Sequence, residues 1–240
     1  MPQIHLSVVI PAFNEEARIR STLDQVIDYL VSRSYSWEIV VADDGSTDAT
    51  ASLVIEVAEG RPEVRLLQLD HRGKGWAVKN GMLAAAGEYR FLCDADLSMP
   101  IEQLERFLPP QVEEAAIVVG SREAANSRRI GEPLLRHLMG RFYNLLVRWL
   151  AVPGISDTQC GFKCFSGEQA SDLFQQQRTD GFAFDVEILF LAHRSGLKVT
   201  EIGIDWYFRE ESKVRPLLDS LLMTGDLIKI RWIHRRRRLR

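Results

Sequence analysis

Residues 37–60 read WEIVVADDGSTDATASLVIEVAEG: a largely apolar run, a polar turn, and then a stretch with helical periodicity. An apolar run of this length bounded by a turn predicts a β-strand over 37–42. Ser46 or Thr47 is expected to cap the helix that follows, which we expect to end near Gly60. A strand, a turn and a helix in this order form half of a parallel βαβ unit.

The same unit recurs through the first half of the chain. Strands are expected over 4–10, 37–42, 64–69, 89–93 and 116–120. The helix after the first strand has one apolar stripe, made by Ile19, Leu23, Val26, Ile27 and Leu30. A later helix runs through Val78, Met82 and Ala85 and is expected to end at Gly87. This alternation predicts an α/β fold with a mostly parallel sheet and helices on both faces.

Four polar segments follow apolar strands directly. They are PAFNE (11–15), DDGSTD (43–48), HRGKG (71–75) and DADLS (94–98). In an open parallel sheet, ligands bind beyond the carboxyl ends of the strands. We therefore expect these four loops to meet at one edge and to form the binding site.

The segment FLCDADLSMP (91–100) places Asp94 and Asp96 one residue apart, where a buried strand ends. Two carboxylates this close repel each other unless a cation lies between them. A solvated turn is the alternative, because Asp is common where strands end. A carboxylate pair with few other ligands suits Mg²⁺ or Mn²⁺ that also binds substrate phosphates.

Two of the other loops offer groups for a nucleotide. Asp43 and Asp44 could accept hydrogen bonds from a base or ribose, while Lys74 and Arg72 could contact phosphate. Taken singly, the first loop could be a helix-capping turn and the other an exposed basic turn. The chain has neither GxGxxG after the first strand nor GxxxxGK[ST], which disfavours a dinucleotide or P-loop site.

The composition is that of an ordinary folded protein. The 240 residues are 46% hydrophobic and 26% charged, and a net charge of −3 gives no reason to expect a nucleic-acid partner. The three cysteines are odd in number and form no zinc motif, so a reducing compartment is expected. We expect no signal peptide, and no apolar window reaches the roughly 18 residues of a membrane-spanning helix.

The second half contains two amphipathic basic segments. Residues 134–152 combine a broad apolar face with His137, Arg141 and Arg148, and suit either a core-facing helix or a membrane interface. Residues 229–240, KIRWIHRRRRLR, suit an anionic lipid surface or a solvated tail. We therefore expect a catalytic domain over 1–213 and an amphipathic basic segment over 214–240 that contacts a membrane.

Taken together, the motifs resemble those of the family-two inverting glycosyltransferases, which have the GT-A fold. The resemblance rests on SVVIPAFNEE, VVADDGSTDAT, HRGKGWAVKNGM and CDADLS. In the second half, GSR (120–122), ISDTQCGFKCF, FAFDVEIL and SKVRP are most similar to the dolichyl-phosphate β-glucosyltransferases. The dolichyl-phosphate mannose synthases share the general plan. The resemblance covers roughly residues 5–230.

The resemblance implies a role for each matching position. The nucleoside and the rest of the donor would be held by Pro11, Ala12, Asn14, Glu15, Asp43, Asp44, Lys74, Asp94 and Ala95. Asp94 and Asp96 would bind the metal, and Ser98 stands where relatives often carry Gln, with water as the alternative ligand. Arg122 and Lys163 would contact phosphates, and Arg141 is a further cation for the acceptor phosphate. The sugar and the acceptor would be lined by Asp157, Gln159, Asp185 and Glu187. For Asp185 and Glu187, the start of a capped helix is the alternative.

The implied reaction is the metal-dependent, inverting transfer of a hexose to a polyprenyl or dolichyl phosphate. Glucose from UDP-glucose is the expected donor, GDP-mannose is the alternative, and a catalytically silent nucleotide-sugar-binding or scaffold protein is the alternative of another class. A phosphate acceptor with a second pKa of about 6 is largely ionised at neutral pH and needs little help from a base. Asp157 is the candidate if a base acts. We expect the protein at the cytoplasmic face of a membrane, bound peripherally; the sequence predicts no oligomeric state.

Overall fold

The computed structural model describes residues 3–112, 115–133, 147, 152–209 and 216–235, with the backbone alone over 216–224. Its strands are β1 (Leu6–Ala12), β2 (Trp37–Asp43), β3 (Val64–Gln68), β4 (Tyr89–Leu92), β5 (Ile117–Ser121), β6 (Arg128–Ile130), β7 (Lys163–Ser166), β8 (Val199–Gly203) and β9 (Asp205–Tyr207). Its helices are α1 (Ile19–Val31), α2 (Thr50–Ala58), α3 (Lys74–Ala84), the 3₁₀ helix η1 (Ile101–Phe107), α5 (Gly167–Gln176), α6 (Phe184–Arg194) and α7 (Pro216–Ile233).

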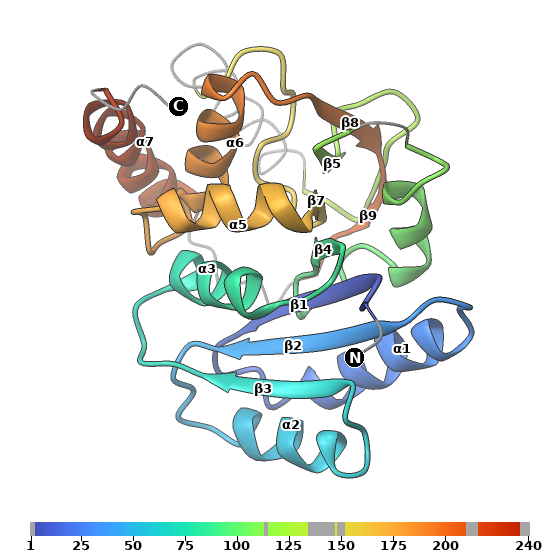
Figure 1. Cartoon of the computed structure of the whole chain (residues 1–240). Helices are drawn as coiled ribbons and strands as arrows, with labels where there is room; N and C mark the ends of the chain where they lie inside the picture. The colour runs from blue at the N-terminus through green and yellow to red at the C-terminus, as the bar shows by residue number, and fades with distance from the viewer. Residues whose placement is uncertain (1–2, 113–114, 134–146, 148–151, 210–215, 236–240) are drawn as a thin grey trace.

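Seven strands form one sheet in the order β3-β2-β1-β4-β7-β5-β8 (Figure 1). β1 pairs in parallel with β2 and β4, and β5 pairs in parallel with β8. Among the described strands of this sheet, β7 alone runs antiparallel, between β4 and β5. The predicted α/β fold with a mostly parallel sheet is therefore confirmed. β6 and β9 form a separate two-stranded sheet.

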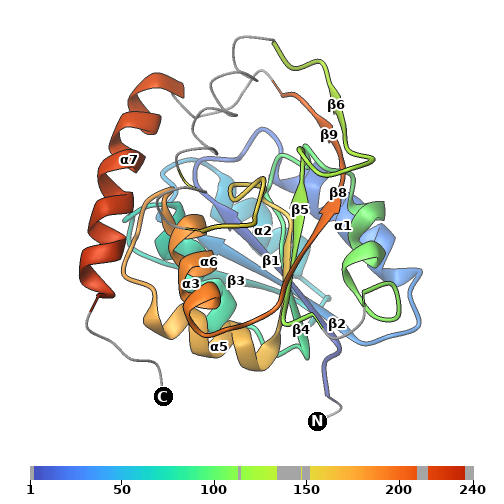
Figure 2. The same ribbon diagram turned by 90° about the horizontal axis from the view of Figure 1, so that it is seen from above.

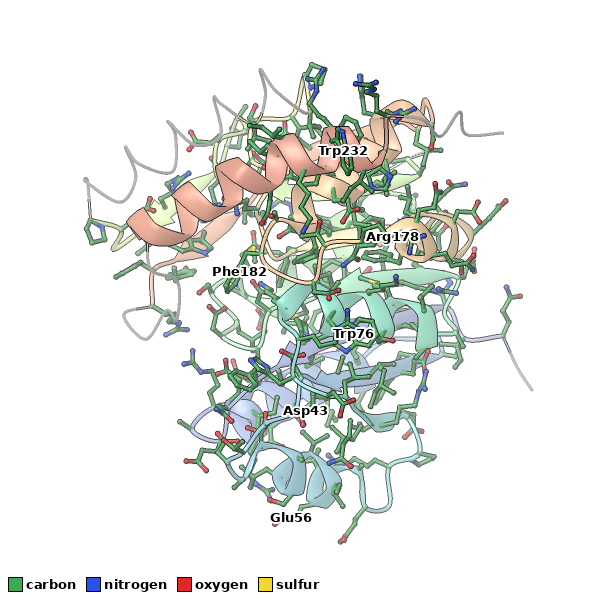
Figure 3. All side chains as sticks on the ribbon, turned by 90° about the vertical axis from the view of Figure 1, so that its left-hand side faces the viewer. Asp43, Glu56, Trp76, Arg178, Phe182 and Trp232 are labelled. Carbon is green, nitrogen blue, oxygen red and sulfur yellow. The ribbon has the colours of Figure 1, made fainter. Side chains whose placement is uncertain are left out.

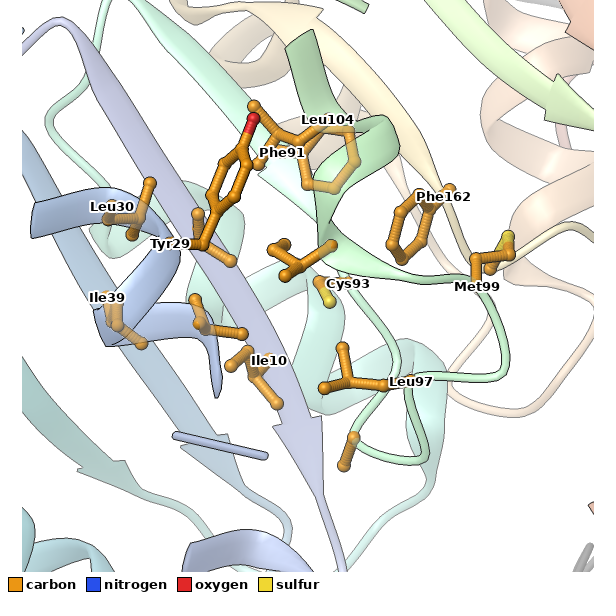
Figure 4. Close-up of a cluster of buried hydrophobic side chains, with 14 of the residues drawn as sticks. Ile10, Tyr29, Leu30, Ile39, Phe91, Cys93, Leu97, Met99, Leu104 and Phe162 are labelled. Atoms are coloured by element: carbon orange, nitrogen blue, oxygen red, sulfur yellow. The ribbon is translucent and has the colours of Figure 1, made fainter. Parts of the chain in front are cut away.

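The sheet separates two apolar layers, because successive side chains of a strand point to opposite faces. Val8 and Ile10 of β1 join a cluster with the apolar sides of α1, α2 and η1, part of which is drawn in Figure 4. Val9, between them, joins a second cluster formed with α3, α5 and α6. The five residues of the predicted α1 stripe are all buried. β1 is buried along its whole length, as expected for a central strand of a parallel sheet.

The predicted cap of α2 is wrong. The helix begins at Thr50, and its preceding residue makes no side-chain capping bond. The Ser46 hydroxyl instead bonds the Asp43 carboxylate, and the Asp48 carboxylate accepts the Thr50 amide at 2.9 Å. Loop 43–48 is thus held as a separate turn rather than as the first turn of the helix.

The C-terminal helix α7 lies beside α6 on the outside of the molecule (Figure 2). Leu227 and Ile230 are buried and belong to the second apolar cluster. Nothing in the structure tests the predicted boundary at 213/214. The amphipathic segment 134–152 and the arginines after Arg235 lie outside the described residues, apart from Val147 and Val152. Among the helices in the described ranges, none is long and apolar enough to cross a membrane.

Candidate active site

The four predicted loops meet at the carboxyl edge of the sheet. Figure 3 views the molecule from the side to which β2 and β3 point in Figure 1, with Asp43 near the centre. Two hydrogen bonds of 2.8 Å join loop 11–15 to loop 43–48. The backbone amide of Asn14 donates to Ser46 Oγ, and the backbone amide of Thr47 donates to the side-chain oxygen Oδ1 of Asn14. Asn14 has a positive φ of 51°, a conformation that Asn adopts more readily than most residues.

Asp44 joins the second loop to the third. One carboxylate oxygen accepts from the Gly73 amide and from His71 Nδ1, each at 2.8 Å, and the other accepts from the Arg72 amide at 3.0 Å. His71 also stacks on Phe13, with ring centroids 4.1 Å apart. Asp44 is buried, so in this structure it positions the loop of Lys74. Its contact with a nucleoside stays a prediction.

The remaining predicted nucleoside residues line the same edge. Pro11 and Ala12 are the buried end of β1, and the Ala12 carbonyl accepts the Asp44 amide at 2.8 Å. The Glu15 amide donates to Thr50 Oγ1 at 2.7 Å, and its carboxylate pairs with Arg18. These contacts fix the backbone of loop 11–15 against α1 and α2. Asp43 is buried and accepts from the Ser46 amide.

Lys74 joins the third loop to the fourth. Its Nζ lies 2.7 Å from Asp94 Oδ1, and each side chain is one-quarter exposed. Burial alone would lower the pKa of Lys74, but the negative charges of Asp94 and Asp185 outweigh it and raise that pKa. A protonated Lys74 therefore stands beside the predicted metal-binding carboxylate, at the mouth of the site.

The DADLS loop is held tightly at its other positions. The Asp96 carboxylate accepts the Ser98 amide at 2.9 Å, and the residue between them, Leu97, has a φ of 42°. The Ser98 carbonyl accepts the Tyr207 amide at 2.7 Å, and the Ala95 carbonyl accepts the Thr22 hydroxyl at 2.6 Å. These bonds fix the conformation of the loop. Metal binding by Asp94, Asp96 and Ser98 stays a prediction.

The donor set suits a metal that takes most of its ligands from a substrate. Over the described ranges, no three His, Cys, Asp or Glu side chains gather closely enough to enclose an ion. The backbone nevertheless leaves room around Asp94: a Cβ placed on Gly161 would lie 1.9 Å from Asp94 Oδ2. The Asp94 carboxylate in this space, with Asp96 two residues further on, offers oxygen ligands of the kind that Mg²⁺ or Mn²⁺ prefers, and these ions readily keep positions open for phosphate oxygens.

Lys163 and Asp185 form a buried ion pair behind this loop. Lys163 Nζ lies 2.5 Å from Asp185 Oδ1 and donates to the Cys160 carbonyl at 2.5 Å. Burial raises the pKa of the Asp185 carboxyl in spite of the neighbouring Lys163 and Lys74. Lys163 is almost fully buried, so in this structure it supports the backbone of the CGFK segment. Its predicted contact with phosphate is not tested.

Arg122 and Asp157 form a second ion pair, with two side-chain hydrogen bonds of 2.7 and 2.9 Å. Burial would raise the pKa of Asp157, but the charge and hydrogen bonds of Arg122 lower it to about 2. Such a carboxylate is a poor proton acceptor at neutral pH, which disfavours Asp157 as a general base. The backbone amide of Gln159 also donates to Asp157 Oδ1, at 3.3 Å.

The last two predicted site residues are placed differently. Arg141 lies outside the described residues. Glu187 is fully buried, and its carboxylate accepts the backbone amides of Arg178 and Thr179. Neither Asp185 nor Glu187 caps α6, since the helix has no side-chain capping bond.

Sequence reasoning missed several residues of the site. Gly161, His71 and Asp180 were not singled out, although the first two stand inside motifs named above. The available signal was Gly161 itself, because a glycine next to a strand often marks a place where another group approaches the backbone closely. Asp180 gives no local signal, because its partner Arg72 is 108 positions away.

Comparison with known proteins gives a consistent result. The family model Glycosyl transferase family 2 matches residues 7–168. The chain is 38% identical to dolichyl-phosphate beta-glucosyltransferase of Dictyostelium discoideum, over 95% of this chain and 74% of the relative. It is 35% identical to the Homo sapiens enzyme of the same name, over 96% and 76%. Among solved structures, glucosyl-3-phosphoglycerate synthase from Mycobacterium tuberculosis in complex with uridine-diphosphate has the same fold, with a TM-score of 0.67 and 24% identity over 95% of this chain and 78% of that one.

Proposed function

The chain belongs to glycosyl transferase family 2, and we propose that it transfers glucose from UDP-glucose to a polyprenyl phosphate, with inversion at the anomeric carbon. The names of its relatives support the sugar and the class of acceptor. The observation that carries the proposal is the 2.7 Å pair between Lys74 and Asp94. It joins the third and fourth loops where a sugar diphosphate would lie.

Loops 11–15, 43–48 and 71–75 would hold the UDP part of the donor. Asp94 and Asp96 would hold Mg²⁺ or Mn²⁺. The mycobacterial synthase has been solved in complex with Mn²⁺ and UDP-glucose, which supports a divalent metal, while the choice of these two residues rests on their spacing after β4. When bound, the ion neutralises the diphosphate and helps it to depart. Lys74 would add a second positive charge on the same leaving group, since the carboxylates beside it keep it protonated.

The acceptor would be positioned rather than deprotonated. A phosphate monoester is largely ionised at neutral pH, so the chemistry requires cations and in-line access to the anomeric carbon. Arg122 would supply one cation, and Asp157 would hold its guanidinium in a fixed orientation. Lys163 and Arg141 would complete the set, and one displacement would give the β-linked product from an α-linked donor.

The lipid acceptor requires access to a membrane, and α7 presents a suitable face. Trp232 is 73% exposed and Ile228 is 68% exposed. Lys229, Arg231 and Arg235 are exposed beside them, and the sequence continues with four more arginines after Arg235. We propose that this face binds the cytoplasmic surface of a membrane peripherally, with apolar burial supplemented by roughly 1 kcal/mol per basic residue near anionic lipid.

Calorimetric titration with UDP tests the donor site directly. We expect Mn²⁺ to tighten UDP binding by about tenfold or more in the wild-type protein, and Asp96→Asn to abolish this gain. Asp70→Asn, which removes an exposed carboxylate near the third loop, is the matched control and should behave as wild type. Equal UDP affinity with Mn²⁺ and with EDTA would contradict the metal role of Asp96.

A further inference from the structure

Glu187 of α6 is a fully buried carboxylate held by hydrogen bonds at both oxygens. Oε1 accepts the Arg178 amide at 2.9 Å, and Oε2 accepts the Thr179 amide at 2.7 Å. His234 Nε2 lies 2.6 Å from Oε1. Burial would raise the pKa of Glu187, but the hydrogen bonds from His234, Thr179 and Arg178 lower it. The group is therefore an ionised acceptor, so His234 must be the donor in this bond.

The segment that Glu187 holds is packed against the donor loop. The Asp180 carbonyl accepts the Trp76 amide at 3.0 Å, and the Asp180 carboxylate pairs with Arg72 at 2.5 Å. Gln177 Nε2 donates to the Gly75 carbonyl at 2.8 Å. Residues 177–181 thus bind loop 71–75 through both its backbone and its side chains.

Glycines in the donor loop make this contact close. A Cβ on Gly73 would lie 2.7 Å from the Asp180 carbonyl oxygen, and one on Gly75 would lie 2.6 Å from the Thr179 carbonyl oxygen. Backbone therefore lies directly on backbone at this interface. No flexible side chain lies between Gly73 or Gly75 and residues 179–180. We therefore expect a displacement of residues 178–180 to move the loop that carries Lys74.

The other end of the connection is the C-terminal helix. His234 is buried directly after α7, and its carbonyl oxygen accepts a hydrogen bond from Arg194 at the end of α6. In Figure 3, Arg178 lies between Trp76 of α3 and Trp232 of α7. The helix that presents the proposed membrane face and the loop that presents Lys74 are thus linked through the Glu187 carboxylate.

We propose that Glu187 and His234 are positioning residues for the donor site, linking α7 through residues 178–180 to loop 71–75. Neither side chain touches a reacting atom; they determine where Lys74 stands. Docking of α7 on a membrane would then favour the arrangement of the loop that binds the donor. The inference rests on the proposed function for the identity of the ligand, but the mechanical link can be tested without any ligand.

Two substitutions of His234 separate the hydrogen bond from packing. His234→Phe keeps a ring in the cavity and removes the donor, while His234→Gln keeps an N–H donor near the position of Nε2. We expect His234→Phe to weaken UDP binding and to raise KM for UDP-glucose by about tenfold, with kcat at saturating donor within about twofold of wild type. His234→Gln should restore both values to within about threefold of wild type.

Amide hydrogen exchange gives the ligand-free measurement. In His234→Phe we expect faster exchange at the amides of Arg178, Thr179 and Trp76, with unchanged exchange at Ser98. Leu227→Ala is the control, because it removes a buried apolar side chain of α7 that cannot form a hydrogen bond to Glu187. It should lower Tm without changing the affinity for UDP.

The proposal fails if His234→Phe exchanges like wild type at Trp76, or if Leu227→Ala weakens UDP binding as much as His234→Phe does. If wild-type protein does not bind UDP, the proposed function fails instead. The exchange rates then still decide whether the link exists.

Discussion

Arg122 and Asp157 are 35 positions apart in the sequence, yet their side chains form a doubly hydrogen-bonded ion pair at 2.7 and 2.9 Å. Arg122 follows β5 and Asp157 precedes β7, and these strands are antiparallel neighbours in the sheet. The Asp157 amide is in turn held by the Glu201 carboxylate of β8 at 3.0 Å. The pair therefore depends on three adjacent strands that are far apart in the sequence.

The depressed pKa of Asp157 predicts a specific dependence of stability on pH. Its pKa is about 2 in the folded protein, against an ordinary value of 3.8. A folded-state pKa below the unfolded value contributes stability that is complete above the unfolded pKa and is lost as pH falls toward the folded one. The shift corresponds to about 2 kcal/mol.

Urea unfolding of wild type and Asp157→Asn measures this contribution. We expect the variant to be less stable by about 3 kcal/mol near neutral pH, because Arg122 loses its buried partner. The difference in unfolding free energy between the two proteins should narrow as pH falls below about 4, because the stability that the ionised Asp157 contributes to the wild type is then progressively lost. A gap that stays constant down to about pH 3 would contradict the assigned pKa.

Gly161→Ala tests the space around Asp94. The new Cβ would lie 1.9 Å from Asp94 Oδ2, so the carboxylate must move. We expect kcat/KM for transfer to fall by about a hundredfold while the far-ultraviolet circular dichroism is unchanged. Gly225→Ala, where a Cβ meets no atom of the described residues within 4 Å, should keep full activity. Full activity in Gly161→Ala would show that the position of Asp94 does not matter.

The coupling between Lys163 and Asp185 can be tested with a single and a double variant. Lys163→Met leaves a buried carboxylate without its cation and should destabilise the protein by about 3–5 kcal/mol. Adding Asp185→Leu should recover most of that loss, because no buried charge is then unpaired. Chemical denaturation measures both. If the double variant is as unstable as Lys163→Met, the two side chains are not coupled as the structure implies.

Trp232→Ala tests the proposed membrane face. Removing this exposed ring should lower sedimentation with vesicles of anionic phospholipid by about tenfold, and raised salt should lower it further. Ile55→Ala is the matched control, since Ile55 is also an exposed apolar residue but lies on α2. Equal sedimentation of the two variants would place the contact elsewhere.

The sheet could be predicted from the sequence because its central strands are buried on both faces. Such strands are continuous apolar runs, and the rule for parallel sheets then places loops 43–48 and 94–98 at one edge. The start of α2 could not be predicted, because Ser46 has a second partner in Asp43 that competes with its use as a cap. Capping propensity describes a helix end in isolation.

The partners of the site residues could not be predicted either. Sequence motifs single out Arg122, Asp157 and Glu187 as polar groups in the right places, but which of them pair depends on long-range strand order. Glu187 was expected to contact sugar or acceptor, and the structure surrounds its carboxylate with two backbone amides and His234. His234 carried no signal of its own, because it lies inside a basic segment that suggests a surface.

A radiolabelled transfer assay tests the proposed reaction itself. UDP-glucose and GDP-mannose, each labelled in the sugar, are presented with polyprenyl phosphate and Mg²⁺ or Mn²⁺, and label in the organic phase is counted. We predict label from UDP-glucose, none from GDP-mannose, and loss of the signal in Asp96→Asn or with EDTA. Label that comes only from GDP-mannose, or transfer that Asp96→Asn and EDTA leave unchanged, would contradict the proposed reaction.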